Sequence, residues 1–413
     1  MKTIGIVSLG CPRNQVDSEI IAFNLRSKGI KITDPYKADG VIINTCSFIT
    51  EAKQETIDTI REFVDIKNKR KKFKVIVSGC FVRHYGLSIP KYLKGIDALV
   101  DVLSFDNKYL PRVNLSLKHF AYLKISEGCL HKCSYCVIPN LKGSLKSRTY
   151  ENILEEVRIL DSQNIKELYL IGQDTTSWGR DFKDKSKDIS FLLEKVHNSA
   201  KNIKWIRLMY LHPNFIDERL IKTIAALPKV CNYIDIPLQH VNDRILKMMN
   251  RNFTYKKTLM LMDKLKKNIP SVAIRTSMIV GFPTETDKEF KQLLNFVKDQ
   301  KFTNLGAFKY SREKGTKAFD FPQVHAKTKQ KRFNQLMSLQ REVSYKNNLD
   351  FIGQNIEVLV DEYRDGISFA RRYSDAYDID GQVLVKGKFS VGEFLKVRVS
   401  GSHEYDLEAE RVQ

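Results

Sequence analysis

The sequence predicts an α/β fold in three parts: an open parallel α/β domain, a β/α barrel or partial barrel, and a small closed β-barrel. Three observations support this prediction. Apolar runs of four to seven residues alternate with helical patterns over residues 1–115, six further strand–helix units occupy residues 116–346, and short strands separated by turns occupy residues 347–413. A chain of 413 residues is long enough to bury a core in each part.

The first part has the pattern of an open parallel sheet with covering helices. We expect strands at residues 3–9, 40–44, 74–78 and 98–102, and helices at residues 18–28 and 52–66. Cys11, Cys46 and Cys80 each follow one of the first three strands. Because the carboxyl ends of parallel strands meet at one edge of a sheet, these cysteines are expected to form one site. The alternative is three separate, small buried side chains.

The second part repeats the strand–helix pattern of a β/α barrel. We expect strands at residues 122–125, 167–172, 205–208, 233–237, 273–280 and 304–310. We expect helices at residues 150–163, 190–200, 215–226, 242–249, 255–267 and 287–299. The active site of such a barrel lies at the carboxyl ends of its strands, and the first strand leads directly into a cysteine-rich loop.

The third part follows a long basic helix at residues 328–348. Strands are expected at residues 356–360, 367–371, 382–385 and 394–400. Short strands of this kind suit a small closed β-barrel, an architecture that often binds nucleic acid or protein.

The composition is that of a soluble globular chain, with 42% hydrophobic and 28% charged residues. No apolar run approaches the roughly 18 residues that span a bilayer, and the N-terminus has the pattern of a strand. We therefore expect a cytoplasmic protein with no membrane association. Its seven cysteines stay reduced in that compartment and point to metal binding or catalysis.

The net charge of +21 is unevenly distributed along the chain. From Asp350 onward there are 13 acidic and 8 basic residues, whereas the first 349 residues have 35 acidic and 61 basic residues. A basic body indicates a nucleic-acid or ribosomal partner, and the alternative is a lysine-rich composition spread over a solvated surface.

Three cysteines, Cys129, Cys133 and Cys136, lie within eight residues at the spacing C-x₃-C-x₂-C. Three thiolates on one short loop can hold three irons of a four-iron cluster and leave the fourth iron open to a ligand. A zinc site would need a fourth ligand, for which His131 is the nearby candidate. A disulfide framework uses cysteines in pairs, so three cysteines favour the iron–sulfur loop.

This loop, with Tyr135 before its last cysteine, resembles the signature of the radical S-adenosylmethionine (SAM) enzymes. The three parts together resemble the methylthiotransferase branch of that superfamily over the whole chain. The resemblance implies two 4Fe-4S clusters and SAM. Cys129, Cys133 and Cys136 would hold the catalytic cluster that cleaves SAM to a 5′-deoxyadenosyl radical. As further metal ligands, Cys11, Cys46 and Cys80 would hold a second cluster that carries sulfur.

The methylthiotransferase family has a branch that modifies a transfer-RNA adenosine and a branch that modifies an aspartate of ribosomal protein S-twelve. Residues 8–12, 173–176 and 371–381 resemble the second branch. The acidic tail favours the same branch, because a domain that binds transfer RNA should be basic; the alternative is that this tail charge is incidental. Two residues depart from the pattern: Gly172 stands in place of alanine, and Thr284 in place of glycine.

Several barrel residues are candidates for binding the cofactor. The resemblance implies that Tyr135 covers the adenine of SAM, although a core tyrosine is the alternative. Gln173 and Asp174 follow one expected strand, and Gln239 ends another. Arg275 lies inside an apolar strand and needs an anionic partner, which is either the cofactor, the substrate or a structural ion pair. His212 and His240 lack the spacing of metal ligands and are expected behind the site or on the surface.

The predicted function is therefore methylthiolation of the β-carbon of an aspartate in ribosomal protein S-twelve, within or near the small ribosomal subunit. An electron donor of the ferredoxin or flavodoxin type and a sulfur donor are implied, and a monomer is expected. One alternative is the same chemistry on a transfer-RNA adenosine. Another is a non-catalytic RNA-binding protein with zinc-stabilised loops.

Overall fold

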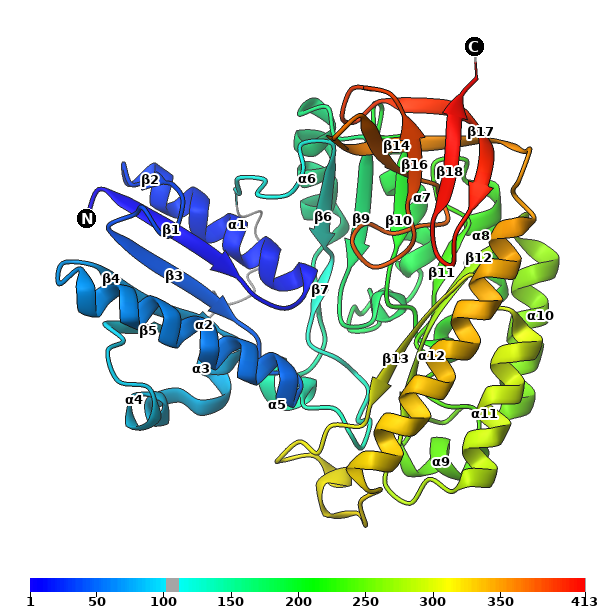
Figure 1. Cartoon of the computed structure of the whole chain (residues 1–413), viewed down its shortest axis with the longest axis horizontal. Helices are drawn as coiled ribbons and strands as arrows, with labels where there is room; N and C mark the ends of the chain where they lie inside the picture. Colours follow the sequence, from blue (N-terminus) through cyan, green and yellow to red (C-terminus); the bar gives the residue numbers. More distant parts are fainter. Residues whose placement is uncertain (102–110, 413) are drawn as a thin grey trace.

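The computed structural model describes residues 1–101 and 111–412 and confirms the predicted α/β fold. Figure 1 shows the N-terminal domain on one side, the β/α barrel beside it, and the tail barrel over the end of the β/α barrel where its strands begin. Among the helices of the described residues, none has both the length and the apolar character that crossing a membrane requires. The expected end of one strand, Val102, lies outside the described residues.

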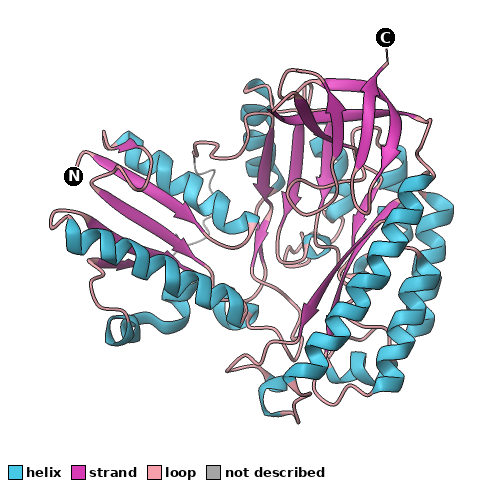
Figure 2. Ribbon diagram, in the orientation of Figure 1, coloured by secondary structure: helices cyan, strands magenta, loops and turns pink. Residues whose placement is uncertain are grey.

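The N-terminal domain is a five-stranded parallel sheet covered by helices (Figure 2). Its strands are β1 (Thr3–Ser8), β2 (Lys31–Ile32), β3 (Gly40–Thr45), β4 (Lys74–Gly79) and β5 (Ala98–Val100), and its helices are α1 (Pro12–Ser27), α2 (Thr50–Lys69), α3 (Cys80–Tyr85) and α4 (Ile89–Tyr92). The strand order β2-β1-β3-β4-β5 changes direction between β1 and β3. In sheets wound this way, ligands bind at the carboxyl ends of the strands beside that change.

Helix α1 begins at Pro12, six residues before the expected start at Ser18. Proline suits the first helical position, because its missing N–H would have no partner there. Apolar periodicity does not predict the first turns of α1, because the residues that this helix buries include Asn14, Asp17 and Glu19. These polar side chains face the rest of the molecule, so the inner face of α1 is a polar interface.

The β/α barrel has six parallel strands in two groups, β6-β9-β10 and β11-β12-β13, joined by a bridge between Ile206 and Val230. The strands are β6 (Phe120–Lys124), β9 (Glu167–Ile171), β10 (Trp205–Leu208), β11 (Tyr233–Asp235), β12 (Ala273–Val280) and β13 (Asn304–Lys309). The helices are α5 (Ile138–Lys142), α6 (Tyr150–Ser162), α7 (Ile189–Ser199), α8 (Glu218–Ala226), α9 (Asp243–Met248), α10 (Tyr255–Asn268) and α11 (Asp287–Gln300); a short ribbon pairs β7 (Ser126–Glu127) with β8 (Lys146–Ser147).

The barrel is partial, because β6 and β13 do not pair within the described residues. The N-terminal domain lies across the gap between them. On one side α1 packs against β6. On the other side, the Thr50 and Ser311 hydroxyls lie 3.0 Å apart, and Lys53 of α2 forms an ion pair with buried Glu313. The N-terminal domain therefore contacts both edges of the open barrel.

Helix α12 (Ala326–Leu349) leads into the tail barrel, which is closed in the order β14-β15-β16-β18-β17. Its strands are β14 (Asn355–Arg364), β15 (Ile367–Arg371), β16 (Val383–Lys386), β17 (Phe394–Ser402) and β18 (Leu407–Arg411). Four of these strands match the prediction and β18 is additional. It pairs with both β16 and β17 and so closes the barrel.

The tail is fixed to the β/α barrel by buried charges at the end where the barrel strands begin. Arg371 pairs with Glu167 of β9 at 2.7 Å and with Asp361 of β14 at 2.5 Å. Asp380 accepts a hydrogen bond from the Tyr233 hydroxyl at 2.7 Å and pairs with Arg275 of β12 at 3.1 Å. Buried ion pairs need such complete partnering, so this contact has one defined geometry.

Candidate active site

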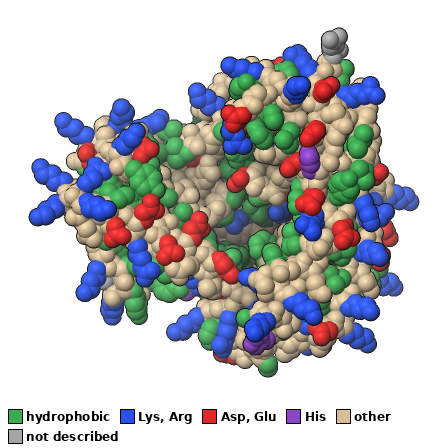
Figure 3. Space-filling view, in the orientation of Figure 1, with side chains coloured by type: hydrophobic (Ala, Val, Ile, Leu, Met, Phe, Trp, Pro, Cys, Tyr) green, Lys and Arg blue, Asp and Glu red, His purple; other side chains and the backbone are tan. Residues whose placement is uncertain are grey.

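A cavity of about 510 Å³ lies at the carboxyl ends of the barrel strands, between the barrel and the N-terminal domain. Figure 3 shows the surface hollowed in this region. The predicted site residues that line it are Cys129, Cys133, Cys136, Tyr135, Gln173, Asp174 and Gln239. The N-terminal domain contributes Arg13, Phe48, Ile49 and Glu51 to the lining.

The cysteine loop folds tightly because a glycine precedes it. Gly128 has a φ of +75°, and a Cβ at this position would lie 2.1 Å from the Ser144 carbonyl oxygen. The Cys129 N–H donates to the Gly143 carbonyl at 3.2 Å, and the Ser134 N–H donates to the Met249 carbonyl at 3.0 Å. Only glycine allows this close approach, which turns the three cysteines toward the cavity.

The loop thiols fit a cluster that binds each of them at a separate iron. Burial raises the pKa of Cys129 to about 11 and that of Cys136 to about 12, so both thiols are neutral until a metal displaces their protons. Thiolates are the ligands that iron–sulfur clusters take, one at each iron.

His131 joins the cysteine loop to the opposite wall of the cavity. Its Nε2 lies 2.7 Å from Asp174 Oδ2, and its ring stacks on that of His212 with centroids 3.7 Å apart. Burial opposes ionisation of Asp174, but hydrogen bonds from His131, Ser177 and Thr176 hold its pKa below the ordinary value. Burial, with the nearby Arg251 charge, lowers the pKa of His212 to about 2. Asp174 thus has protein partners, and its role in the structure is to hold His131.

Gln173 leaves one polar atom available in the cavity wall. Its Nε2 donates to Glu127 at 2.8 Å, and Glu127 in turn pairs with Lys124 at 3.0 Å. Its buried Oε1 has no hydrogen-bond partner among the described residues. A buried acceptor of this kind costs free energy unless a ligand donates to it. A bound molecule with an N–H or O–H group, such as the amino group of SAM, would fit this position.

Tyr135 and Gln239 also lie in the wall, whereas Arg275 lies outside the cavity. The Tyr135 ring packs on the apolar cluster around Phe282, and its hydroxyl accepts a hydrogen bond from Arg251 at 3.4 Å. Gln239 has a φ of +71° and bridges to β12 through its backbone. Arg275 pairs with Asp235 and Asp380. The structure thus gives Arg275 the structural ion pair that was one of its predicted alternatives.

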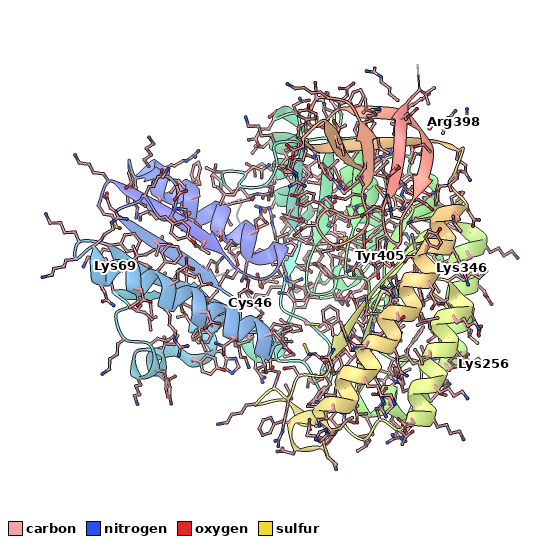
Figure 4. All side chains as sticks on the ribbon, in the orientation of Figure 1. Cys46, Lys69, Lys256, Lys346, Arg398 and Tyr405 are labelled. Atoms are coloured by element: carbon pink, nitrogen blue, oxygen red, sulfur yellow. The ribbon has the colours of Figure 1, made fainter. Side chains whose placement is uncertain are left out.

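The three N-terminal cysteines lie together at the carboxyl edge of the sheet, and Figure 4 shows Cys46 on the side that faces the barrel. A Cβ on Gly10 would lie 2.8 Å from the Cys46 Sγ, which places the Cys11 and Cys46 loops in contact. Cys11 precedes α1 and Cys80 begins α3. The positive ends of helix dipoles favour thiolates and other anions, so this edge suits a metal cluster with anionic ligands.

Asn14 ties these cysteine loops together. Its Nδ2 donates to the Leu9 and Thr45 carbonyls, each at 2.9 Å, and its Oδ1 lies 3.9 Å from the Cys80 Sγ. Burial raises the pKa of Cys80 to about 11 and raises that of Cys46 as well. One side chain therefore contacts the ends of β1, β3 and β4.

The two departures from the family pattern have local structural reasons. A Cβ on Gly172 would lie 2.7 Å from the Ser126 Oγ, so alanine there would require the serine side chain to turn away. Thr284 has a φ of +65°, a conformation that favours glycine. The Arg244 guanidinium holds this turn by donating to the Thr284 hydroxyl at 2.9 Å and carbonyl at 2.8 Å.

The cavity residues that were not predicted as site residues include Arg13, His131, His212 and Arg251. Arg13 could have been found, because it lies two residues after Cys11. The sequence indicates His131 only as a candidate zinc ligand. His212 and Arg251 reach the cavity through folding of the barrel, and no local sequence pattern marks them.

Comparisons with protein families match each part of the chain. Residues 123–297 match the Radical SAM superfamily, residues 3–101 match the uncharacterized protein family UPF0004, and residues 352–412 match the TRAM domain.

Close relatives share the full length of the chain. It is 41% identical to the ribosomal protein uS12 methylthiotransferase RimO of Clostridium kluyveri, over 98% of this chain and 97% of that protein. It is also 41% identical to the protein of the same name from Petrotoga mobilis, over 100% of both chains.

Solved structures share the fold at low sequence identity. The radical SAM methyltransferase TsrM of Kitasatospora setae, with cobalamin and a 4Fe-4S cluster bound, has a TM-score of 0.54 at 11% identity, covering 77% of this chain and 74% of that chain. TsrM with its tryptophan substrate and a SAM analogue has a TM-score of 0.52 at 12% identity, covering 74% and 73%.

Proposed function

The chain belongs to the family of ribosomal protein uS12 methylthiotransferases named RimO, and we propose from this membership that it adds a methylthio group to the β-carbon of an aspartate in uS12. The observation that carries the proposal is the cavity at the carboxyl ends of the barrel strands. It is lined by Cys129, Cys133 and Cys136 and, from the other domain, by Arg13, which follows Cys11 by two residues.

A radical SAM enzyme uses SAM and an iron–sulfur cluster, and the loop cysteines would hold that cluster. We propose that Cys11, Cys46 and Cys80 hold a second 4Fe-4S cluster. When bound, the two clusters would supply the electron that cleaves SAM and an open iron that carries sulfur.

The protein side chains position the cofactor and exclude water. Gln173 Oε1, which has no partner among the described residues, would accept a hydrogen bond from the SAM amino group, and the Tyr135 ring would cover the adenine. Arg251 lies between Tyr135 and the Pro237 carbonyl, to which it donates at 2.7 Å, and its charge suits the SAM carboxylate. Phe48 and Phe308 line the cavity and are 42% and 48% exposed, so they form an apolar rim where a protein segment would enter.

The remaining components are supplied from outside the chain. We propose that the electron comes from a protein of the ferredoxin or flavodoxin type and the sulfur from a separate donor. The enzyme would act as a monomer on uS12 within or near the small ribosomal subunit.

The test is anaerobic reconstitution of the full chain, followed by mass spectrometry of uS12 and of transfer RNA after incubation with SAM, reductant and sulfide. We expect methylthioaspartate in uS12 and unmodified adenosine. Cys133→Ala should abolish formation of 5′-deoxyadenosine, whereas Cys46→Ala should keep that formation and lose methylthio transfer. Methylthioadenosine in transfer RNA with unmodified uS12 would contradict the proposed substrate. A purified chain that contains zinc and no iron would contradict the assignment of the protein as an iron–sulfur enzyme.

A further inference from the structure

Arg13 extends from the start of α1 into the cavity, between the two groups of cysteines. It lines the cavity together with the three loop cysteines and follows Cys11 by two residues. Its NH1 donates to the Gly172 carbonyl at 2.7 Å, and its guanidinium lies 5.1 Å from the centre of the Tyr210 ring. These two contacts hold the positive charge at the wall of the cavity.

The charge of Arg13 has no carboxylate within ion-pair distance in the part of the chain that the structure describes. By contrast, Lys142 lies 3.4 Å from Glu127 and 3.9 Å from Asp17. A guanidinium has five N–H donors, of which the Gly172 carbonyl takes one. Arg13 is half-buried in the cavity wall, so its remaining donors are available to an anion in the cavity.

Arg13 lies between the two groups of cysteines. It lines the same cavity as Cys129, Cys133 and Cys136. It also lies in the first turn of α1, two residues after Cys11, and the neighbouring Gly10 packs against Cys46. An anion bound at Arg13 would therefore be adjacent to both sites.

We propose that Arg13 binds the anionic sulfur species, hydrosulfide or methanethiolate, that occupies the cavity between the two cysteine sites. This inference rests on the proposed function, in which sulfur must be present in that cavity. A guanidinium can direct two charge-assisted N–H donors from one rigid plane at a single sulfur anion, an orientation that the flexible lysine ammonium does not fix. Arg13 is thus a binding residue for the sulfur ligand, and Arg251 is the corresponding cation beside the SAM pocket.

The test measures ligand affinity of the full chain, reconstituted anaerobically and freed of excess sulfide. Sodium hydrosulfide and SAM are titrated separately, and the electron paramagnetic resonance spectra of the reduced clusters report binding. Arg13→Met should weaken hydrosulfide binding by about 10- to 100-fold, with iron content and SAM affinity unchanged within about twofold. Arg13→Lys should fall between wild type and Arg13→Met. The matched control is Arg83→Met, because Arg83 also donates to a carbonyl across the domain interface, that of Leu141, but lies outside the cavity lining.

Three outcomes overturn the inference. Hydrosulfide affinity of Arg13→Met within twofold of wild type would show that Arg13 does not bind the ligand. Loss of SAM affinity with normal hydrosulfide affinity would assign Arg13 to the SAM carboxylate. Failure of both Arg13→Met and Arg13→Gln to hold the second cluster would assign Arg13 to cluster assembly. A wild-type chain that holds one cluster contradicts the proposed function instead, so the two failures are distinguishable.

Discussion

Arg371 of the tail barrel and Glu167 of the β/α barrel form an ion pair of 2.7 Å that is sealed from solvent. Arg371 also donates to the Tyr169 hydroxyl at 2.8 Å, and Glu167 pairs with Arg207 at 2.9 Å. Removal of one partner from such a network leaves an uncompensated charge in a dry site. The attachment of the tail is therefore sensitive to single substitutions.

Arg371→Met should lower the free energy of unfolding by about 3–5 kcal/mol, because Glu167 and Asp361 would lose their shared cation. Thermal or denaturant unfolding of the full chain measures the change. Arg398→Met is the matched control, since Arg398 is exposed on β17 and should alter stability by less than about 0.5 kcal/mol. Equal midpoints for the two variants would show that the buried network does not hold the tail.

Asn14→Ala should remove the second cluster and spare the first. The substitution deletes the amide that donates to the Leu9 and Thr45 carbonyls, so the loops that carry Cys11 and Cys46 lose their common tie. The iron content should fall by half, and the variant should still form 5′-deoxyadenosine. Asn24→Ala, on the exposed side of the same helix, should keep the full iron content. Loss of both clusters in Asn14→Ala would indicate a collapse of the whole cavity.

Asp174→Asn should weaken the cluster held by the C-x₃-C-x₂-C loop. An amide nitrogen cannot accept the hydrogen bonds that Asp174 Oδ2 accepts from His131 and Ser177, so His131 would lose its fixed position. The expected result is a lower iron content of the loop and a rate of SAM cleavage reduced at least about tenfold. Asp184→Asn, at an exposed turn, is the control. Normal iron content with normal SAM cleavage would show that the loop holds its geometry without this contact.

Asp97 should make the stability of the N-terminal domain pH-dependent. Although burial opposes it, hydrogen bonds from Lys67, the Val75 N–H and Lys74 lower the pKa of Asp97 to about 2. A carboxyl whose folded pKa is lowered stabilises the fold above its unfolded pKa of about 3.9, and this contribution disappears as the pH falls toward 2.

The unfolding midpoint of Asp97→Asn should therefore lie below that of wild type at pH 7, and the difference should vanish between pH 4 and pH 2. Asp58→Asn is the control, since Asp58 is exposed, where it pairs with Arg61 at 3.7 Å and accepts a hydrogen bond from Gln54 at 2.9 Å. A difference that stays constant across this pH range would exclude ionisation of Asp97 as its cause.

The sequence predicted the α/β elements closely where apolar periodicity was strong. The strands at 205–208 and 273–280 coincide with β10 and β12. Four strands were missed for physical reasons. The strands β2, β7 and β8 have only two residues each, and β18, with the sequence LEAER, buries only Leu407 and Ala409. The family assignment was confirmed by the full-length relatives, because the cysteine spacing and the order of domains are specific features.

The site was predictable where chemistry is encoded in local spacing. The loop cysteines, Gln173 and Asp174 were placed correctly at strand ends, and the structure brings them to one cavity. Arg275 was harder to assign, because its partner Asp380 is 105 residues away in another domain. The stack of His131 on His212 likewise depends on two loops that meet only after the barrel forms.

The buried contact of residues 371–380 with the β/α barrel also fixes the distance between the tail and the cavity. The tail barrel lies where the barrel strands begin, and the cavity lies where they end (Figure 1). The eight residues of β12 span about 26 Å at roughly 3.3 Å per residue. The contact between the tail and the barrel therefore lies on the order of 25 Å from the cavity, at the opposite end of the barrel strands.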